Sequence, residues 1–173
     1  MPEKMASPAG RVAYLLRYIM YLLLFWDWIP MRATYSYLCS SQGGITIFKT
    51  FEQWKNEYPG VVETLRSEND STSKTNGNRR YVQLNQRFIR EIYTTRYPFD
   101  IRKYDNRIVD ILNNDILVQY IDFDTERNPD NPKSFSDYKP WRYSKSCEPD
   151  GQKENRSLFS NLAYLFKYGK EHR

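Results

Sequence analysis

The chain has 173 residues, of which 40% are hydrophobic and 27% charged, and its formal net charge is +5. This composition excludes an intrinsically disordered chain, and the length suffices for one modest hydrophobic core. A single histidine, His172, and two cysteines, Cys39 and Cys147, leave zinc and iron–sulfur sites without a set of ligands. We therefore expect no metal site and no small-molecule cofactor.

The most apolar segment lies near the N-terminus, at residues 12–31. About 20 mostly apolar residues can cross a bilayer, and the tyrosines and tryptophans near its ends suit the membrane interfaces. Arg17 interrupts the segment, but its long side chain can reach the headgroups, and Asp27 lies between two tryptophans at interface depth. We expect an uncleaved transmembrane anchor at 12–31, preceded by a short cytoplasmic N-terminus at 1–11.

Two alternatives to a single-pass signal anchor are a cleaved signal peptide and a buried or interfacial helix of a soluble protein. No small-x-small cleavage site follows the apolar run, and Leu38 before Cys39 does not suit a lipoprotein site. More cations precede the uncharged centre than follow it, which places the later domain in the periplasm or an equivalent non-cytoplasmic space. A mitochondrial inner membrane is the alternative location, and there the arguments for orientation and for a disulfide weaken.

The two cysteines suit a translocated domain. An even number of cysteines in an oxidising compartment predicts one disulfide, between Cys39 and Cys147, whereas two unrelated buried thiols are the alternative. Such a bond would close a loop of about 100 residues, which contributes about 4–5 kcal/mol in the chain-entropy model.

Behind the anchor we expect a linker at 32–43 and a soluble domain at 44–173. Thr50 and Gln53 have the spacing of a capping box, so a helix should begin at residue 51 and end before the Pro-Gly pair at 59–60. Residues 67–78 include no apolar side chain, which predicts a loop.

From residue 80 to 124 the apolar residues recur with a period of two, which indicates strands. Segments 107–112 and 116–123 flank Asn113-Asn114-Asp115, and this pattern predicts a hairpin. A helical stripe of apolar residues at 158–166 should pack on the sheet. The predicted fold class is α+β: a transmembrane helix, then a small domain with an antiparallel meander of about four strands packed by one or two helices.

No phosphate-loop, dinucleotide or nucleophile-elbow motif is present, and we assign no catalytic residue. Acidic residues alternate from Asp122 to Asp130 and resemble a calcium loop. However, Arg127 and Lys133 stand where an EF-hand loop needs glycine and glutamate. A polar strand exit is the simpler interpretation.

Arginines and aromatic residues are interleaved between residues 79 and 107. We expect contact with another envelope protein or with anionic lipid through Arg87, Arg90, Tyr93, Arg96, Tyr97, Arg102 and Tyr104. Nucleic acid would suit such a pattern in a cytoplasmic protein, but no RNA-binding motif is present and the anchor argues against access. The remaining interpretation is a solvated sheet face with cross-strand Arg–Tyr and Arg–Glu pairs.

These patterns favour a membrane-anchored binding or accessory protein whose non-cytoplasmic domain contacts another envelope protein or membrane complex. The alternative is a membrane-tethered hydrolase with an unrecognised carboxylate site. A deep pocket where two acids converge would favour the hydrolase, and a flat aromatic–arginine surface would favour the binding protein.

Overall fold

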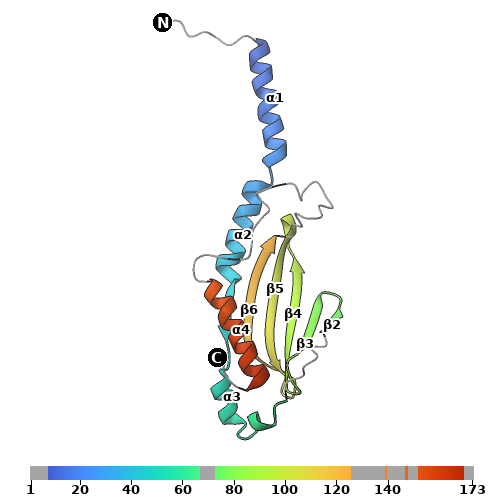
Figure 1. The fold of residues 1–173 in the computed structure, drawn as a ribbon. Coiled ribbons are helices and arrows are strands. Elements are labelled where there is room, and N and C mark those ends of the chain that lie inside the picture. The colour runs from blue at the N-terminus through green and yellow to red at the C-terminus, as the bar shows by residue number, and fades with distance from the viewer. Residues whose placement is uncertain (1–7, 67–72, 126–138, 140–146, 148–151, 170–173) are drawn as a thin grey trace.

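The structure is a computed structural model, and it describes residues 8–66, 73–125, 139, 147 and 152–169. It contains one six-stranded antiparallel sheet together with helices, which confirms the α+β class (Figure 1). Helices α3 and α4 lie against one face of the sheet, and α1 extends away from the sheet with no other element beside it (Figure 1).

The N-terminal segment forms two successive helices, α1 (Pro8–Phe25) and α2 (Trp28–Gln42). One continuous helix over 12–31 was expected, but a turn at residues 26–27 separates the two. The side chain of Asp27 in this turn is buried and accepts a hydrogen bond from Lys139 Nζ at 2.6 Å. The ion pair therefore ties the turn to the domain.

The segment 32–43 was expected to be a linker, yet it is helical as far as Gln42. The reason is packing, because Met31, Leu38 and Cys39 are buried on α2 at spacings that suit one helical face. Helix α2 is thus joined to the domain and does not act as a flexible connection.

The next elements are β1 (Gly44–Ile47), α3 (Phe51–Glu57) and the short 3-10 helix η1 (Val62–Thr64). The predicted capping box at the start of α3 is confirmed. Gln53 N donates to Thr50 Oγ1 at 3.2 Å, and Thr50 N donates to Gln53 Oε1 at 2.9 Å.

The sheet has the strand order β1-β6-β5-β4-β3-β2. After β1, its strands are β2 (Ser73–Asn76), β3 (Arg79–Gln83), β4 (Phe88–Arg96), β5 (Ile101–Asp110) and β6 (Asp115–Thr125). The 3-10 helix η2 (Pro98–Asp100) connects β4 to β5. The expectation of about four strands was too low for two reasons. Strand β1 pairs with the distant β6, and β2 lies in the polar segment that was predicted to be a loop.

The predicted hairpin is confirmed as β5 and β6. Asp110 pairs with Asp115 at its closed end, and Asn114 has a positive φ of 58° in the turn. The pairing register of β5 and β6 shifts between Ile108 and Val109, which interrupts the alternation of side chains between the two faces. The consecutive residues Leu117 and Val118 are accordingly both buried.

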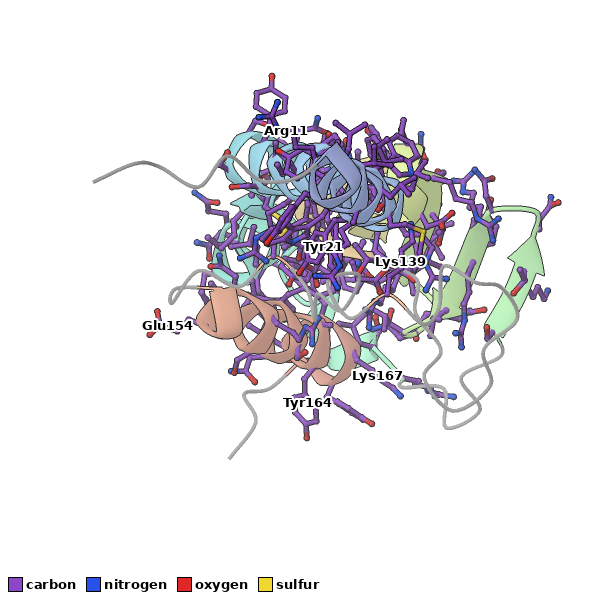
Figure 2. The ribbon with its side chains drawn as sticks, turned by 90° about the horizontal axis from the view of Figure 1, so that it is seen from above. Arg11, Tyr21, Lys139, Glu154, Tyr164 and Lys167 are labelled. Atoms are coloured by element: carbon purple, nitrogen blue, oxygen red, sulfur yellow. A yellow bond between two sulfur atoms is a disulfide. The ribbon has the colours of Figure 1, made fainter. Side chains whose placement is uncertain are left out.

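Helix α4 (Gln152–Tyr168) packs on the sheet, as its apolar stripe predicted. Phe166 is fully buried and makes edge-to-face contacts with Phe51 and Phe88, at centroid distances of 5.3 and 5.0 Å. Phe159 is buried as well, whereas Leu158 at the start of the stripe is exposed. Glu154 and Tyr164 on α4 point away from the sheet (Figure 2).

A second, smaller core joins α2 to the end of the sheet where β5 begins and β6 ends. Cys39 and Cys147 form a disulfide within it, with a Cα–Cα distance of 5.3 Å. Leu38, Ile101 and Phe123 pack around the bond. The bond and this core together fasten α2 to the sheet.

Candidate interaction surface

The residues expected to contact a partner do not form one surface. Neighbouring residues of a strand point to opposite faces, so β4 places Arg90 and Arg96 on the α4 side with Phe88, and Tyr93 on the other side. Tyr97 packs against the second core beside Phe123, with their ring centroids 6.1 Å apart. The band that the sequence suggested is therefore split between two faces.

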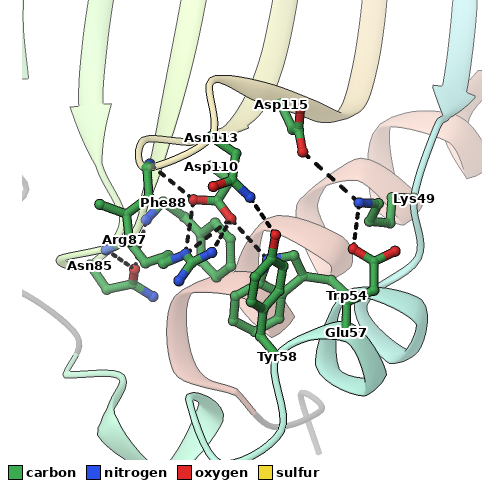
Figure 3. A network of polar contacts seen from close by, with 11 residues as sticks. Lys49, Trp54, Glu57, Tyr58, Asn85, Arg87, Phe88, Asp110, Asn113 and Asp115 are labelled. Carbon is green, nitrogen blue, oxygen red and sulfur yellow. Dashed lines mark hydrogen bonds and ion pairs between the residues drawn. The ribbon is translucent and has the colours of Figure 1, made fainter.

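Arg87 lies in the interior of the domain and is not available to a partner (Figure 3). Its guanidinium donates to both oxygens of Asp110, with Nε at 2.9 and 3.0 Å and Nη2 at 2.8 Å. It also lies over the rings of Trp54 and Tyr58, at 5.2 and 4.5 Å from their centroids. We therefore correct the expectation for Arg87: its role is structural.

Asp110 is the acceptor at the centre of this network. Trp54 Nε1 donates to it at 2.9 Å, and the backbone N of Leu112 at 3.1 Å. Burial alone would raise the pKa of the Asp110 carboxyl, but the bonds from Arg87 and Trp54 outweigh burial, so its pKa lies below the usual value. The network links α3, the start of β4 and the β5–β6 hairpin.

The sheet face opposite α3 and α4 carries a continuous polar network, which we call the polar face. Arg79 Nη2 donates to Glu91 Oε1 at 2.6 Å, and Arg107 Nη2 donates to Asp105 Oδ2 at 2.6 Å. Tyr93 lies between the two arginines, whose guanidinium carbons are 4.7 and 5.0 Å from its ring centroid. This arrangement corresponds to the cross-strand Arg–Tyr and Arg–Glu pairs weighed above.

The arginines and carboxylates of this polar network, Arg79, Glu91, Asp105 and Arg107, are paired with one another. The bond to Asp105 raises the pKa of Arg107 despite the opposing effect of burial. Burial and the neighbouring Glu91 together raise the pKa of Tyr93, whose hydroxyl donates to Glu91 Oε2 at 3.1 Å. Glu91 and Asp105 are thus each held by an arginine within the domain.

The remaining predicted contacts lie at the α2 end of the sheet, on the α4 side. Arg102 is paired with Asp124 at 3.4 Å and lies over the ring of Tyr104 at 5.6 Å. Burial raises the pKa of Asp124, and Arg102 opposes that rise. Arg96 is exposed and lines a groove at the β2–β3 turn.

Sequence reasoning missed two polar clusters because their members are far apart in the chain. One is the Asp27–Lys139 pair beside the α1–α2 turn. The other centres on Asp122, which accepts bonds from Arg156 Nη2 at 2.8 Å and from the backbone N of Cys147 at 3.0 Å. No local pattern could have predicted either, since each depends on the tertiary fold.

The acids from Asp122 onward do not gather into a metal site within the part of the chain that the structure describes. There, no three histidine, cysteine or acidic residues come together as a metal-binding group. Asp122 is bonded to donors and Asp124 is paired with Arg102, while Glu126 and Asp130 of the acidic run lie outside the described residues.

The chain matches no protein-family model, no curated protein and no solved structure.

Proposed function

We propose that this chain is a single-pass membrane-anchored binding or accessory protein. In this proposal α1 crosses the bilayer, and the α+β domain lies outside the cytoplasm and contacts another envelope protein or membrane complex. The observation that carries the proposal is the exposure of α1.

Helix α1 presents apolar side chains that nothing in the described chain covers; for example, Leu15 is 64% exposed and Leu23 68% exposed. Together with α2 it forms the one helical stretch, Arg11–Gln42, that is long and apolar enough to cross a membrane among the described residues. Burying one such side chain contributes about 1.5–3 kcal/mol. Several of them outweigh a cost of about 2.5–3.5 kcal/mol for Arg17, which lies off centre.

The turn between α1 and α2 supports a position at the membrane surface. Trp26 and Trp28 are exposed on either side of Asp27, and tryptophan favours the interface between lipid and water. Asp27 is turned inward to Lys139, so its charge is kept from the lipid. The bilayer would then end close to this ion pair.

The disulfide supports a non-cytoplasmic location for the domain, because such bonds persist in oxidising compartments. Together with the cations before the apolar centre, it favours a cytoplasmic N-terminus in a bacterial envelope. The intermembrane side of a mitochondrial inner membrane is the alternative.

In this proposal the protein contact surface lies at the end of the domain that carries the β5–β6 turn, which is the end opposite α1 (Figure 1). Exposed apolar side chains gather there on the β5–β6 turn and the adjoining end of β1, where Phe48 N donates to Leu117 O at 2.9 Å. They are Ile47, Phe48, Ile111, Leu112 and Ile116. We call this group the apolar tip. Contiguous exposed apolar side chains are typical of protein contacts, and a bilayer that holds α1 does not reach this end.

Affinity purification of the full chain from its membranes in a mild neutral detergent tests this function. We expect a stoichiometric envelope protein to co-purify with the wild type and to be lost with Leu112→Asp, since Leu112 is 71% exposed in the apolar tip. Leu158→Asp is the matched control, because Leu158 is an exposed leucine on α4. Equal recovery with all three chains would contradict the proposed contact.

A further inference from the structure

Two arginines lie side by side on the α4 side of the sheet. In the β3–β4 register Arg80 pairs with Ile92 and Val82 pairs with Arg90, so the two guanidinium groups are diagonal neighbours. Burial lowers the pKa of Arg90, and the charge of Arg80 lowers it further. The fold thus places the partly buried Arg90 beside the exposed cation of Arg80.

Neither arginine has a carboxylate partner among the described residues. Arg90 Nη2 donates to the neutral Asn106 Oδ1 at 2.8 Å, and the Phe159 ring lies 5.1 Å from its guanidinium carbon. The Nε of Arg90 is buried and has no acceptor in the described structure. Arg80 Nε donates only to Ser73 Oγ, at 2.7 Å. Every arginine of the polar face, by contrast, is bonded to an acid.

Arg80 also lines a groove of about 610 Å³ at the β2–β3 turn. Arg79, Arg96 and the threonines at 75, 94 and 95 line the same groove, and none of the described residues that line it is acidic. Arg79 is paired with Glu91, whereas Arg80 lines the groove without an acid partner among the described residues. Arg90 does not line the groove but adjoins it as the diagonal neighbour of Arg80. Threonine hydroxyls can add hydrogen bonds to an anion in such a groove.

We propose that Arg80 and Arg90, with the adjoining groove, bind a phosphoryl group. Two guanidinium groups without an acid among the described residues match the charge of −1.5 to −2 that a phosphate monoester carries near pH 7. The guanidinium fork also fits phosphate oxygens in a bidentate manner. The group belongs to a lipid headgroup or to a soluble phosphate, and both present the same oxygens to the arginines. The proposal is independent of the apolar tip and its partner.

The test is titration calorimetry on the full chain in neutral detergent at pH 7.5. The probe is inorganic phosphate, and sodium chloride at equal ionic strength serves as the blank. We expect saturable binding that Arg80→Gln weakens by about tenfold or more, which is the scale of one lost charge-assisted hydrogen bond. Arg66→Gln, at an exposed arginine outside the groove, should bind as the wild type does.

A second variant, Arg90→Gln, should also lose phosphate binding. Its circular dichroism spectrum is first shown to match that of the wild type, so that lost binding does not reflect unfolding. Titration with dihexanoyl phosphatidic acid then separates the two sources. Tighter binding than inorganic phosphate indicates a lipid headgroup, and equal binding indicates a soluble phosphate. No saturable binding to either probe, or binding that Arg80→Gln leaves unchanged, would overturn the proposal.

Discussion

Replacing Arg87 by methionine should destabilise the domain, because Asp110 would then be a buried carboxylate without a cation. Asp110 is only 1% exposed, and the Arg87→Met change removes three of its contacts, at 2.8–3.0 Å. The bonds from Trp54 and Leu112 would remain. Removing one partner of a buried ion pair costs about 3–5 kcal/mol of unfolding free energy.

Urea unfolding of the full chain in neutral detergent measures this loss. With a urea dependence of about 2 kcal/mol per molar for a small domain, the midpoint should fall by about 2 M. In the double variant Arg87→Met, Asp110→Leu the loss should be smaller than the sum of the two single losses, by more than about 1 kcal/mol. A midpoint shift below about 0.5 M for Arg87→Met would refute a structural role for this pair.

The pH dependence gives an independent check on the same pair. In the wild type the folded pKa of Asp110 is depressed, so its contribution to stability is present above the unfolded pKa of about 3.9 and is lost as pH falls through the folded pKa. In Arg87→Met the folded pKa should instead rise above the unfolded value. The stability deficit of the variant should therefore narrow as pH falls from 7 toward 4, and a constant deficit would contradict this account.

Three further predictions concern stability, each measured by the same urea assay. Leu162→Asp should cost about 2–4 kcal/mol, because Leu162 packs against the main core, and an unmoved midpoint would exclude α4 from that core. Cys39→Ser should cost about 2–5 kcal/mol by removing the bond to Cys147, and reductant should then have no further effect on the variant. Asn114→Val should cost about 1–2 kcal/mol because its φ is 58°, whereas Asn114→Gly should be nearly neutral.

Elements with a strong local signal could be predicted from the sequence. The capping box at Thr50 and Gln53, the turn at 113–115 and the apolar stripe of α4 each depend on neighbours within a few residues. Those signals correspond to short-range interactions, and the structure contains all three elements.

Features that depend on long-range contacts could not be predicted. Helix α2 was expected to be a linker, but its buried residues pack into a core formed by strands about 60–90 residues later in the chain. The sequence around α2 does not indicate that contact. Strand β1 has only four residues, and its partner β6 is about 70 residues away. Nothing local marks either contact.

The candidate site shows the same limit. The spacing of arginine and tyrosine predicted a basic and aromatic surface. It could not show which of these side chains are buried or paired with acids inside the domain. Arg87 is buried against Asp110 and Arg107 is held by Asp105, whereas Arg80 and Arg90 have no acid among the described residues. Which arginines are paired with acids and which are not depends on the strand register and on the tertiary fold.

Alkaline carbonate extraction of membranes that contain the full chain tests the central claim, that α1 crosses the bilayer, most directly. At pH 11 the full-length protein should remain with the membrane pellet, because the exposed apolar side chains of α1 would be held in lipid. Release of the intact chain into the supernatant would contradict the claim, and α1 would then be a peripheral or protein-covered helix.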